Sequence, residues 1–480
     1  MKKHIAQPTF LICDYETFGK NPALDKPVQF AAIRTDYYFN PVEKPTILFC
    51  RPSDDYLPEP EAVLLNEITP QQALQKGITE AEFTKKIHKI LNKPNTCILG
   101  YNNIKFDDEI HRNIFYRNFY DPYGWSWKHG NSRWDLLNVM HACYALRPEG
   151  IQWPINEQGF PSFKLENLTD NNGITHINSH DAMNDVYATL ELAKLIQKIQ
   201  PKLFNYLYEH RTKQQIKKII NISKMKPLIH VSNILNFNKK NINYIIPIIW
   251  HPKNSNILIA YNVNSNIETL LNWNINTLHE QLSLNNTYPK QTEKNNTFNL
   301  IHINRCPILV PFNALRTSDI IRLQLNPNTC LKKAAILKNN QQNIYKKISL
   351  LYSNTNYTIP SISDHVDNKI YDNFFTTSDL VTMKTVHSTP PRKLSKLKIN
   401  FIDNRLKSLL FYYKARNFPN TLNQTEHNNW KKYKKKIFNV SKLSIYTCKL
   451  QILLCIHRKN KTKINILNSL MEYLKKITNL

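Results

Sequence analysis

Long apolar runs and paired cysteines are both missing from this sequence. No apolar run approaches the ~20 residues that a membrane-spanning helix needs, and Asp14 interrupts the apolar run near the N-terminus, which argues against a signal peptide. The eight cysteines are scattered and form no CxxC pair, so we expect no zinc site and free thiols in a reducing compartment. These absences predict a cytoplasmic protein without a membrane span.

Acidic residues and glycine are also scarce. The chain has 36 Asp and Glu against 64 Lys and Arg, which gives a formal net charge of +28, and it has 8 glycines. Heavy use of Asn, Ile and Lys with little glycine is typical of an AT-rich genome, so mutational bias is one source of the excess lysine. A surface this basic nevertheless attracts polyanions, of which nucleic acid is the commonest. An anionic membrane is the alternative, and the missing apolar span counts against it.

The residues that are present suit a multidomain globular protein. A chain of 480 residues exceeds one ordinary core, and 41% hydrophobic with 11% aromatic residues supports globular packing. The first part alternates strand-like and helix-like patterns, which predicts an α/β domain. Short β-type runs in Asn-rich connections follow, and the remainder is mostly helical in pattern. We therefore predict three domains, at 1–200, 201–355 and 356–480.

Two carboxylates lie two positions apart in an otherwise apolar strand. The segment FLICDYETFG, residues 10–19, is typical of a buried strand, and its alternation places Asp14 and Glu16 on one face with Tyr15 on the other. Two like charges near a core repel each other and are poorly solvated. A divalent cation such as Mg²⁺, which prefers oxygen ligands, removes both penalties. Taken alone, the pair is better explained as the solvated end of a strand.

Further acids favour a metal site. Asp107 follows the apolar strand TCILGYN, where its alternative role is to cap a helix, although Asp108 is the better candidate for that cap. His180 and Asp185 are five positions apart, which corresponds to about 140° around a continuous helix. We therefore expect His180 in the loop that leads into the helix and Asp185 on its second turn, from which both side chains reach one cleft. An exposed histidine and a solvated helical acid are the alternatives.

Together these residues resemble the DEDDh pattern of 3′→5′ exonucleases, which has four acids and a histidine five positions before the last acid. Within that group the chain is most similar to the bacterial exodeoxyribonuclease I family. The segments that carry the resemblance are DYETFGKNPALDKPVQFAAIRTD, GYNNIKFDDEIHRNIFYRNFYDPY, NSRWDLLNVM, ALRPEG, HDAMNDVYAT, MKPLIHVS, HINRCP and YYKARNFPNTL. They span nearly the whole chain, and their combination is highly specific although each segment alone is weak.

The resemblance implies a role for each member of the pattern. Asp14 and Asp185 would be the principal metal ligands, Glu16 would bind metal and the 3′ end, and Asp107 would complete the set. His180 would act as general base towards the attacking water. The implied cofactor is a pair of Mg²⁺ ions, with Mn²⁺ able to substitute, that clamp the attacking and leaving oxygens. The implied reaction releases 5′-mononucleotides from single-stranded DNA in repair and recombination.

Basic and aromatic residues are interleaved between residues 112 and 134, a pattern typical of grooves that bind single strands. Aromatic residues at this density are normally core residues, but the loop DPYGWSW is difficult to bury whole. The resemblance assigns the DNA path to Arg112, Tyr123, Trp127, His141, Lys164, Asn256 and His302. Lys164 and His141 stand where the family usually has arginine. The first change loses a bidentate contact, and the second weakens a phosphate contact at neutral pH.

The resemblance also implies a fold and a partner. The fold is a ribonuclease H-like nuclease domain, an SH3-like β domain and a helical C-terminal domain, arranged as a clamp that would make degradation processive. The implied partner is the acidic C-terminal tail of single-stranded DNA-binding protein, contacted by Arg147 and Arg316, although each could equally be an ordinary surface cation. We expect a monomer.

Two alternative functions stay open from the sequence. One is an RNA-trimming enzyme with the same acids, because sugar preference cannot be read from spacing. The other is a binding protein with a decayed nuclease site, against which the presence of all five catalytic residues counts.

Overall fold

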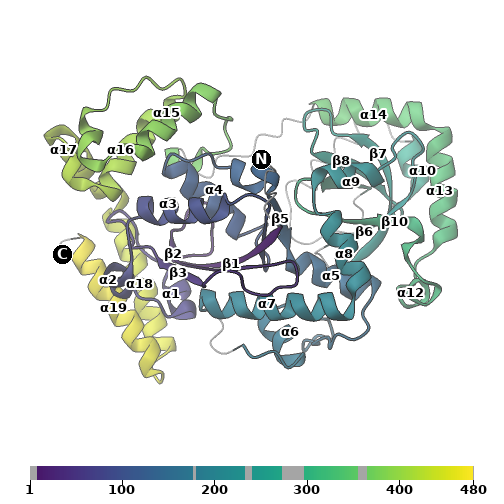
Figure 1. The fold of residues 1–480 in the computed structure, drawn as a ribbon, viewed down its shortest axis with the longest axis horizontal. Helices are drawn as coiled ribbons and strands as arrows, with labels where there is room; N and C mark the ends of the chain where they lie inside the picture. The colour runs from purple at the N-terminus through teal and green to yellow at the C-terminus, as the bar shows by residue number, and fades with distance from the viewer. Residues whose placement is uncertain (1–7, 177–179, 233–240, 273–296, 355–364, 479–480) are drawn as a thin grey trace, which may run out of the picture. The chain divides into compact units, whose positions relative to one another are not determined.

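The structure, a computed structural model, describes residues 8–176, 180–232, 241–272, 297–354 and 365–478 (Figure 1). The chain forms two compact units, each assembled from segments that are distant in sequence. The first unit consists of Met1–Ser132, Thr175–Leu190 and Ile359–Leu480, and the second of Arg133–Ile174 and Glu191–Thr358. The segment predicted as the nuclease domain therefore contributes to both units. The predicted boundary near residue 355 lies outside the described residues, and the domain limits stay a prediction.

The first unit contains four neighbouring strands of a five-stranded mixed sheet, in the order β3-β2-β1-β4. These strands are β1 (Thr9–Thr17), β2 (Pro27–Thr35), β3 (Thr46–Phe49) and β4 (Thr96–Gly100). β1 pairs antiparallel with β2 and parallel with β4, and every residue of β2 is buried. Aliphatic and aromatic side chains predominate in β1, β2 and β4, and such residues fit a pleated sheet that is covered on both faces. The predicted α/β architecture is confirmed.

The first unit also contains helices from the N-terminal part of the chain. They are α1 (Pro60–Asn66), α2 (Pro70–Lys76), α3 (Glu80–Leu91), α4 (Asp107–Arg117) and α7 (Ala182–Ile199), of which only the first half of α7 belongs to the first unit. α3 begins where the Thr79 side chain accepts the backbone N–H of Glu82, a regular N-cap. Its buried residues Phe83, Ile87 and Leu91 recur every four positions and join the core beneath β1.

The C-terminal part of the first unit is helical, as predicted. Its helices are α15 (Thr377–Ser388), α16 (Asn404–Asn417), α17 (Gln424–Ile437), α18 (Val440–Ile456) and α19 (Lys461–Thr478). α18 and α19 lie beside α1 and α2 (Figure 1). Buried Leu450 and Leu467 share one core with Phe18 and Val63 of the N-terminal segment. The two ends of the chain are therefore held together by a common apolar core.

The second unit contains an antiparallel sheet in the order β10-β6-β7-β8-β9. Its strands are β6 (Leu228–Val231), β7 (Ile242–Trp250), β8 (Ile257–Asn262), β9 (Phe298–His302) and β10 (Ile308–Pro311). Its helices are α5 (Leu136–Leu146), α6 (Leu165–Asn171), α8 (Pro201–Glu209), α9 (Lys213–Ile219), α10 (Ile267–Asn272), α12 (Thr317–Arg322), α13 (Pro327–Asn339) and α14 (Gln341–Asn354). The β-rich region predicted in the middle of the chain is confirmed.

Short elements occupy several connections. The chain passes from the first unit to the second at β5 (Ser132–Asp135). The described 3₁₀ turns are η1 (Gly124–Ser126), η2 (Lys128–Gly130), η4 (Phe312–Ala314), η5 (Val366–Asn368), η6 (Pro391–Lys396) and η7 (Pro419–Thr421).

Two expectations about the whole chain can be compared with the structure. In the described ranges, no helix combines the length and the apolar character that crossing a bilayer requires. The cysteines are free thiols, and all except Cys448 and Cys455 are buried, as the scattered spacing predicted.

Candidate active site

The two carboxylates of β1 project from the same face of the strand. Asp14 and Glu16 pair in register with Ala31 and Gln29 of β2. Tyr15, between them, points the other way and is 4% exposed in the core. Its hydroxyl lies 2.9 Å from His111 Nδ1, within hydrogen-bond distance. The predicted alternation is confirmed, and it sets both acids side by side.

Asp107 lies against the same stretch of β1. Its Oδ1 accepts the backbone N–H of Tyr15 at 3.1 Å, so the carboxylate is hydrogen-bonded to the residue between Asp14 and Glu16. The N-cap position of α4 is Phe106, which makes no side-chain capping bond, and Asp107 is the first residue of the helix. The alternative in which Asp107 caps the helix is therefore wrong. The buried carboxylate belongs to the acidic cluster.

His180 and Asp185 come from the start of α7. The helix begins at Ala182, so His180 precedes it, as predicted, whereas Asp185 lies in the first turn and not the second. His180 has φ of +73°, in the left-handed region that costs a non-glycine residue of order 1 kcal/mol and often marks functional positions. One ligating atom each of Glu16, His180 and Asp185 lie within 4.8 Å of one another. These three side chains therefore face a common point.

Burial and mutual repulsion dominate the electrostatics of the cluster. The pKa of Asp14 is raised well above its ordinary value, first by burial and then by the charges of Asp107, Asp185 and Glu16. The pKa of Glu16 is raised in the same way, with burial first and then Asp185 and Asp107. Acids this close favour a divalent cation, which would let all of them ionise together. The donor set of hard carboxylate oxygens with one imidazole fits such an ion.

Two residues that the sequence analysis did not single out hold α7 in place. Gln29 is 2% exposed, and its amide donates to Asp181 Oδ2 at 3.1 Å and accepts the N–H of Ala182 at 3.1 Å. His176 Nε2 lies 2.6 Å from Asp185 Oδ1. Gln29 could have been found as the lone amide in an apolar strand. No pattern pointed to His176, because it lies outside the spacing that links His180 to Asp185.

The predicted DNA-path residues of the first unit lie partly at its surface. Trp127 is 64% exposed, so it is not a core residue, and Lys128 Nζ lies 5.5 Å from its ring. The guanidinium of Arg112 lies 6.0 Å from the ring of Tyr123 and forms an ion pair with Glu109. A phosphate at Arg112 would therefore compete with an acid that already holds it.

The predicted DNA-path residues of the second unit differ in exposure. Asn256 and His302 are neighbours, because the backbone oxygen of Asn256 accepts the N–H of Ile303 at 2.8 Å. The side chain of Lys164 is 73% exposed. His141, in contrast, is 4% exposed, and its ring centroid lies 4.0 Å from that of Phe163. This burial argues against a direct phosphate contact by His141.

Arg147 and Arg316, the two arginines predicted to bind a partner, both contact the carboxylate of Asp319. Arg147 Nη1 lies 3.4 Å and Arg316 Nε 2.7 Å from Asp319 Oδ2, and Arg316 also pairs with Glu149 at 2.6 Å. Asp319 is 1% exposed, and hydrogen bonds from Arg316 hold its pKa below the ordinary value, against burial. Both guanidiniums remain partly exposed, at 30% and 42% of their side chains.

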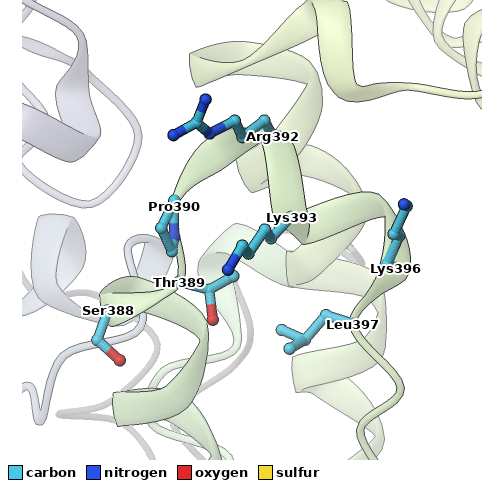
Figure 2. A pocket seen from close by; sticks show the side chains of 7 residues that line it. All are labelled: Ser388, Thr389, Pro390, Arg392, Lys393, Lys396 and Leu397. Atoms are coloured by element: carbon cyan, nitrogen blue, oxygen red, sulfur yellow. The ribbon is translucent and has the colours of Figure 1, made fainter.

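A basic pocket lies elsewhere in the first unit. It has a volume of about 630 Å³ and is lined by Ser388, Thr389, Pro390, Arg392, Lys393, Lys396 and Leu397. Figure 2 shows the side chain of Lys393 extending towards Thr389. Its lining has three cations and no acid, so it suits an anionic group and offers no ligands for metal-dependent chemistry.

The sheet, its paired acids and the acids of α4 and α7 together define an exonuclease of the ribonuclease H-like class. Family models agree: one described as exonuclease matches residues 11–193, one as exonuclease I SH3-like domain matches 211–354, and one as exonuclease I C-terminal domain matches 364–477. The chain is 48% identical over 475 residues to exodeoxyribonuclease I of Escherichia coli K12, with 98% of each chain covered. The chain belongs to the exodeoxyribonuclease I family.

Solved structures agree with this assignment. E. coli exonuclease I in complex with a dA16 oligonucleotide superposes with a TM-score of 0.93 at 48% identity and covers 98% of this chain and 100% of its own. A zinc-bound form of E. coli exonuclease I with single-stranded DNA gives 0.91 at 47% identity, with coverage of 98% and 100%. A structure described as SSB/exonuclease I with an inhibitor gives 0.90 at 47% identity, with the same coverage.

Proposed function

We propose that this chain degrades single-stranded DNA from its 3′ end, releasing 5′-mononucleotides by metal-dependent hydrolysis. The observation that carries the proposal is the meeting of Glu16, His180 and Asp185 within 4.8 Å. Asp14 and Asp107 complete the acidic set around them. The solved relatives that bind single-stranded oligonucleotides support the choice of substrate.

The acids are proposed to hold two Mg²⁺ ions, for which Mn²⁺ can substitute. Asp14 and Asp185 would be the principal ligands, with Glu16 and Asp107 completing the set. A pair of such ions stabilises the attacking and leaving oxygens of an in-line displacement at phosphorus. The raised pKa of Asp14 and of Glu16 supports this role, because a cation supplies the charge that the cluster lacks. The zinc-bound relative supports divalent metal in general.

His180 is proposed as the general base. It precedes α7 on a loop, so its ring can approach the cluster from a direction that no helical residue shares. From there its neutral imidazole would take a proton from the attacking water, while Glu16 contacts the 3′ end. A positioned base of this kind contributes roughly 10²–10⁴-fold to the rate.

The strand is proposed to follow basic and aromatic side chains in both units. Trp127 and Tyr123 would stack on bases, and Arg112 and Lys164 would contact phosphates. Asn256 and His302 would contribute from the second unit. The resemblance assigns His141 to the same path, but its burial argues against a direct contact with the strand.

We also propose that Arg147 and Arg316 bind the acidic tail of single-stranded DNA-binding protein. The partial exposure of both guanidiniums, and the structure described as SSB/exonuclease I, support this partner. A carboxylate from the tail would share or replace the bonds to Asp319 and Glu149. We expect a monomer in the cytoplasm.

The test is a digest of end-labelled single strands of DNA and RNA of one sequence, with Mg²⁺ or with chelator. We expect mononucleotides from DNA only when Mg²⁺ is present, and slow or no release from RNA. Faster release from RNA would support the RNA-trimming alternative. Binding of the DNA without release in Mg²⁺ or Mn²⁺ would support a binding protein with an inactive site.

A further inference from the structure

His176 makes a close contact with one of the acids of the cluster. Its Nε2 lies 2.6 Å from Asp185 Oδ1, and its side chain is 5% exposed against 17% for Asp185. The histidine lies on the segment before α7, nine positions ahead of its partner. A buried bond this short between an imidazole and a carboxylate restricts both side chains strongly.

The position of His176 differs from that of His180. Glu16, His180 and Asp185 each offer a ligating atom to one point, and within the described residues His176 belongs to no such group. His176 thus contacts one member of this group and is not itself a member. Asp185 also accepts a hydrogen bond from the backbone N–H of His180. The carboxylate is thus held from the loop that precedes the helix.

At a metal site, one oxygen of a carboxylate can bind the metal while the other accepts a hydrogen bond from the protein. When one oxygen accepts a fixed hydrogen bond, the plane of the group is set and the other oxygen points in one direction. Without that bond, the short side chain of a residue in the first helical turn can rotate among several conformers. Outer hydrogen bonds of this kind typically change metal affinity by about 10–100-fold.

We propose that His176 is a positioning residue that orients the Asp185 carboxylate for metal binding through an Nε2–H···Oδ1 hydrogen bond. The inference rests on the proposed function, since it assigns a task to the metal that the cluster would hold. In this role His176 acts on the metal only through Asp185.

The test combines metal binding with activity. For His176→Ala we expect the dissociation constant for Mn²⁺, measured by calorimetry on the DNA-free protein, to rise about 10–100-fold. The Mg²⁺ concentration for half-maximal hydrolysis should rise by a similar factor, while the rate at saturating Mg²⁺ stays within about threefold. Affinity for single-stranded DNA in chelator should be unchanged.

Two further variants separate positioning from packing. His176→Gln places an amide N–H at a similar reach and should recover much of the Mn²⁺ affinity. Thr175→Ala, at the exposed neighbouring position, should behave as the wild type in every measurement. A variant that only loosened the loop would lower the melting temperature, and His176→Gln would then give no recovery of metal affinity.

The possible results are distinguishable. If wild type binds Mn²⁺ and hydrolyses DNA but His176→Ala binds Mn²⁺ within twofold of it, the inference is overturned and the proposed function stands. Equal loss of affinity in His176→Ala and His176→Gln with lower melting temperatures would also overturn it. If the wild type itself neither binds Mn²⁺ nor hydrolyses DNA, the proposed function fails first.

Discussion

Removing one negative charge from the acidic cluster should stabilise the metal-free protein. Glu16→Gln keeps the size of the side chain, and its amide oxygen can still accept the bond that Asn66 gives to Glu16. Ligating oxygens of Glu16 and Asp185 lie within 4.8 Å, where two full charges repel by about 3.5 kcal/mol at an effective dielectric constant near 20. Burial raises the pKa of both acids and so disfavours their charged forms, which makes this full-charge figure an upper value. We therefore expect unfolding free energy to rise by about 1–3 kcal/mol.

The difference in unfolding free energy between Glu16→Gln and wild type should grow as pH rises. The pKa of Glu16 is raised in the folded protein by burial first and then by Asp185 and Asp107, so the folded state keeps its proton to higher pH than the unfolded chain. The wild type therefore loses stability as pH rises through that raised pKa, and Glu16→Gln does not. The two proteins should be equally stable near about pH 4, and the variant should be the more stable at about pH 8.

The assay is denaturant or thermal unfolding in chelator and in excess Mg²⁺. Glu472→Gln, at an exposed position of α19, is the matched control and should change stability by no more than about 0.5 kcal/mol. Mg²⁺ should stabilise the wild type by mass action and the Glu16 variant much less. If Glu16→Gln were less stable than wild type in chelator at about pH 8, the reasoning from charge repulsion would be refuted.

Four other predictions concern the proposed chemistry and strand path. Asp14→Ala should leave less than a few per cent of hydrolysis in saturating Mg²⁺ with strand binding largely intact, measured by product release and by fluorescence anisotropy. His180→Ala should lower turnover by about 10²–10⁴-fold, and activity should recover partly as pH rises because hydroxide replaces the base; lost metal affinity with normal turnover would instead make it a ligand. Trp127→Ala should weaken strand binding by about 1–3 kcal/mol without changing its salt dependence. Arg112→Ala should lower the slope of log affinity against log salt by about 0.7; an unchanged slope would mean that Arg112 pairs with Glu109 and not with a phosphate.

The alternation of side chains along β1 was sufficient to predict how the two acids of that strand are placed. The period of two along β1 placed Asp14 and Glu16 together and turned Tyr15 into the core, because a strand offers only two faces. The 140° separation of His180 and Asp185 on a helix correctly excluded a continuous helix through both. The exposed position of Trp127 agrees with the difficulty of burying its loop.

Contacts between distant segments could not be predicted in the same way. The bond from Tyr15 N–H to Asp107 joins residues 92 positions apart, a separation that no local pattern spans. Gln29 binds the start of α7 across 152 and 153 positions. His141 is buried beside Phe163, which no local pattern of charge or hydropathy indicated. These contacts depend on how the sheet and helices pack, and packing is a property of the whole chain.

The most direct test of the central claim is the release of label from single-stranded DNA labelled at its 3′ end, by wild type and by Asp14→Asn. With wild type in Mg²⁺, labelled mononucleotide should be the first product, and chelator should abolish its release. Asp14→Asn should bind the same strand and release almost none. Release of long labelled fragments by wild type, or equal release by wild type and Asp14→Asn, would contradict an acidic metal cluster that hydrolyses the strand from its 3′ end.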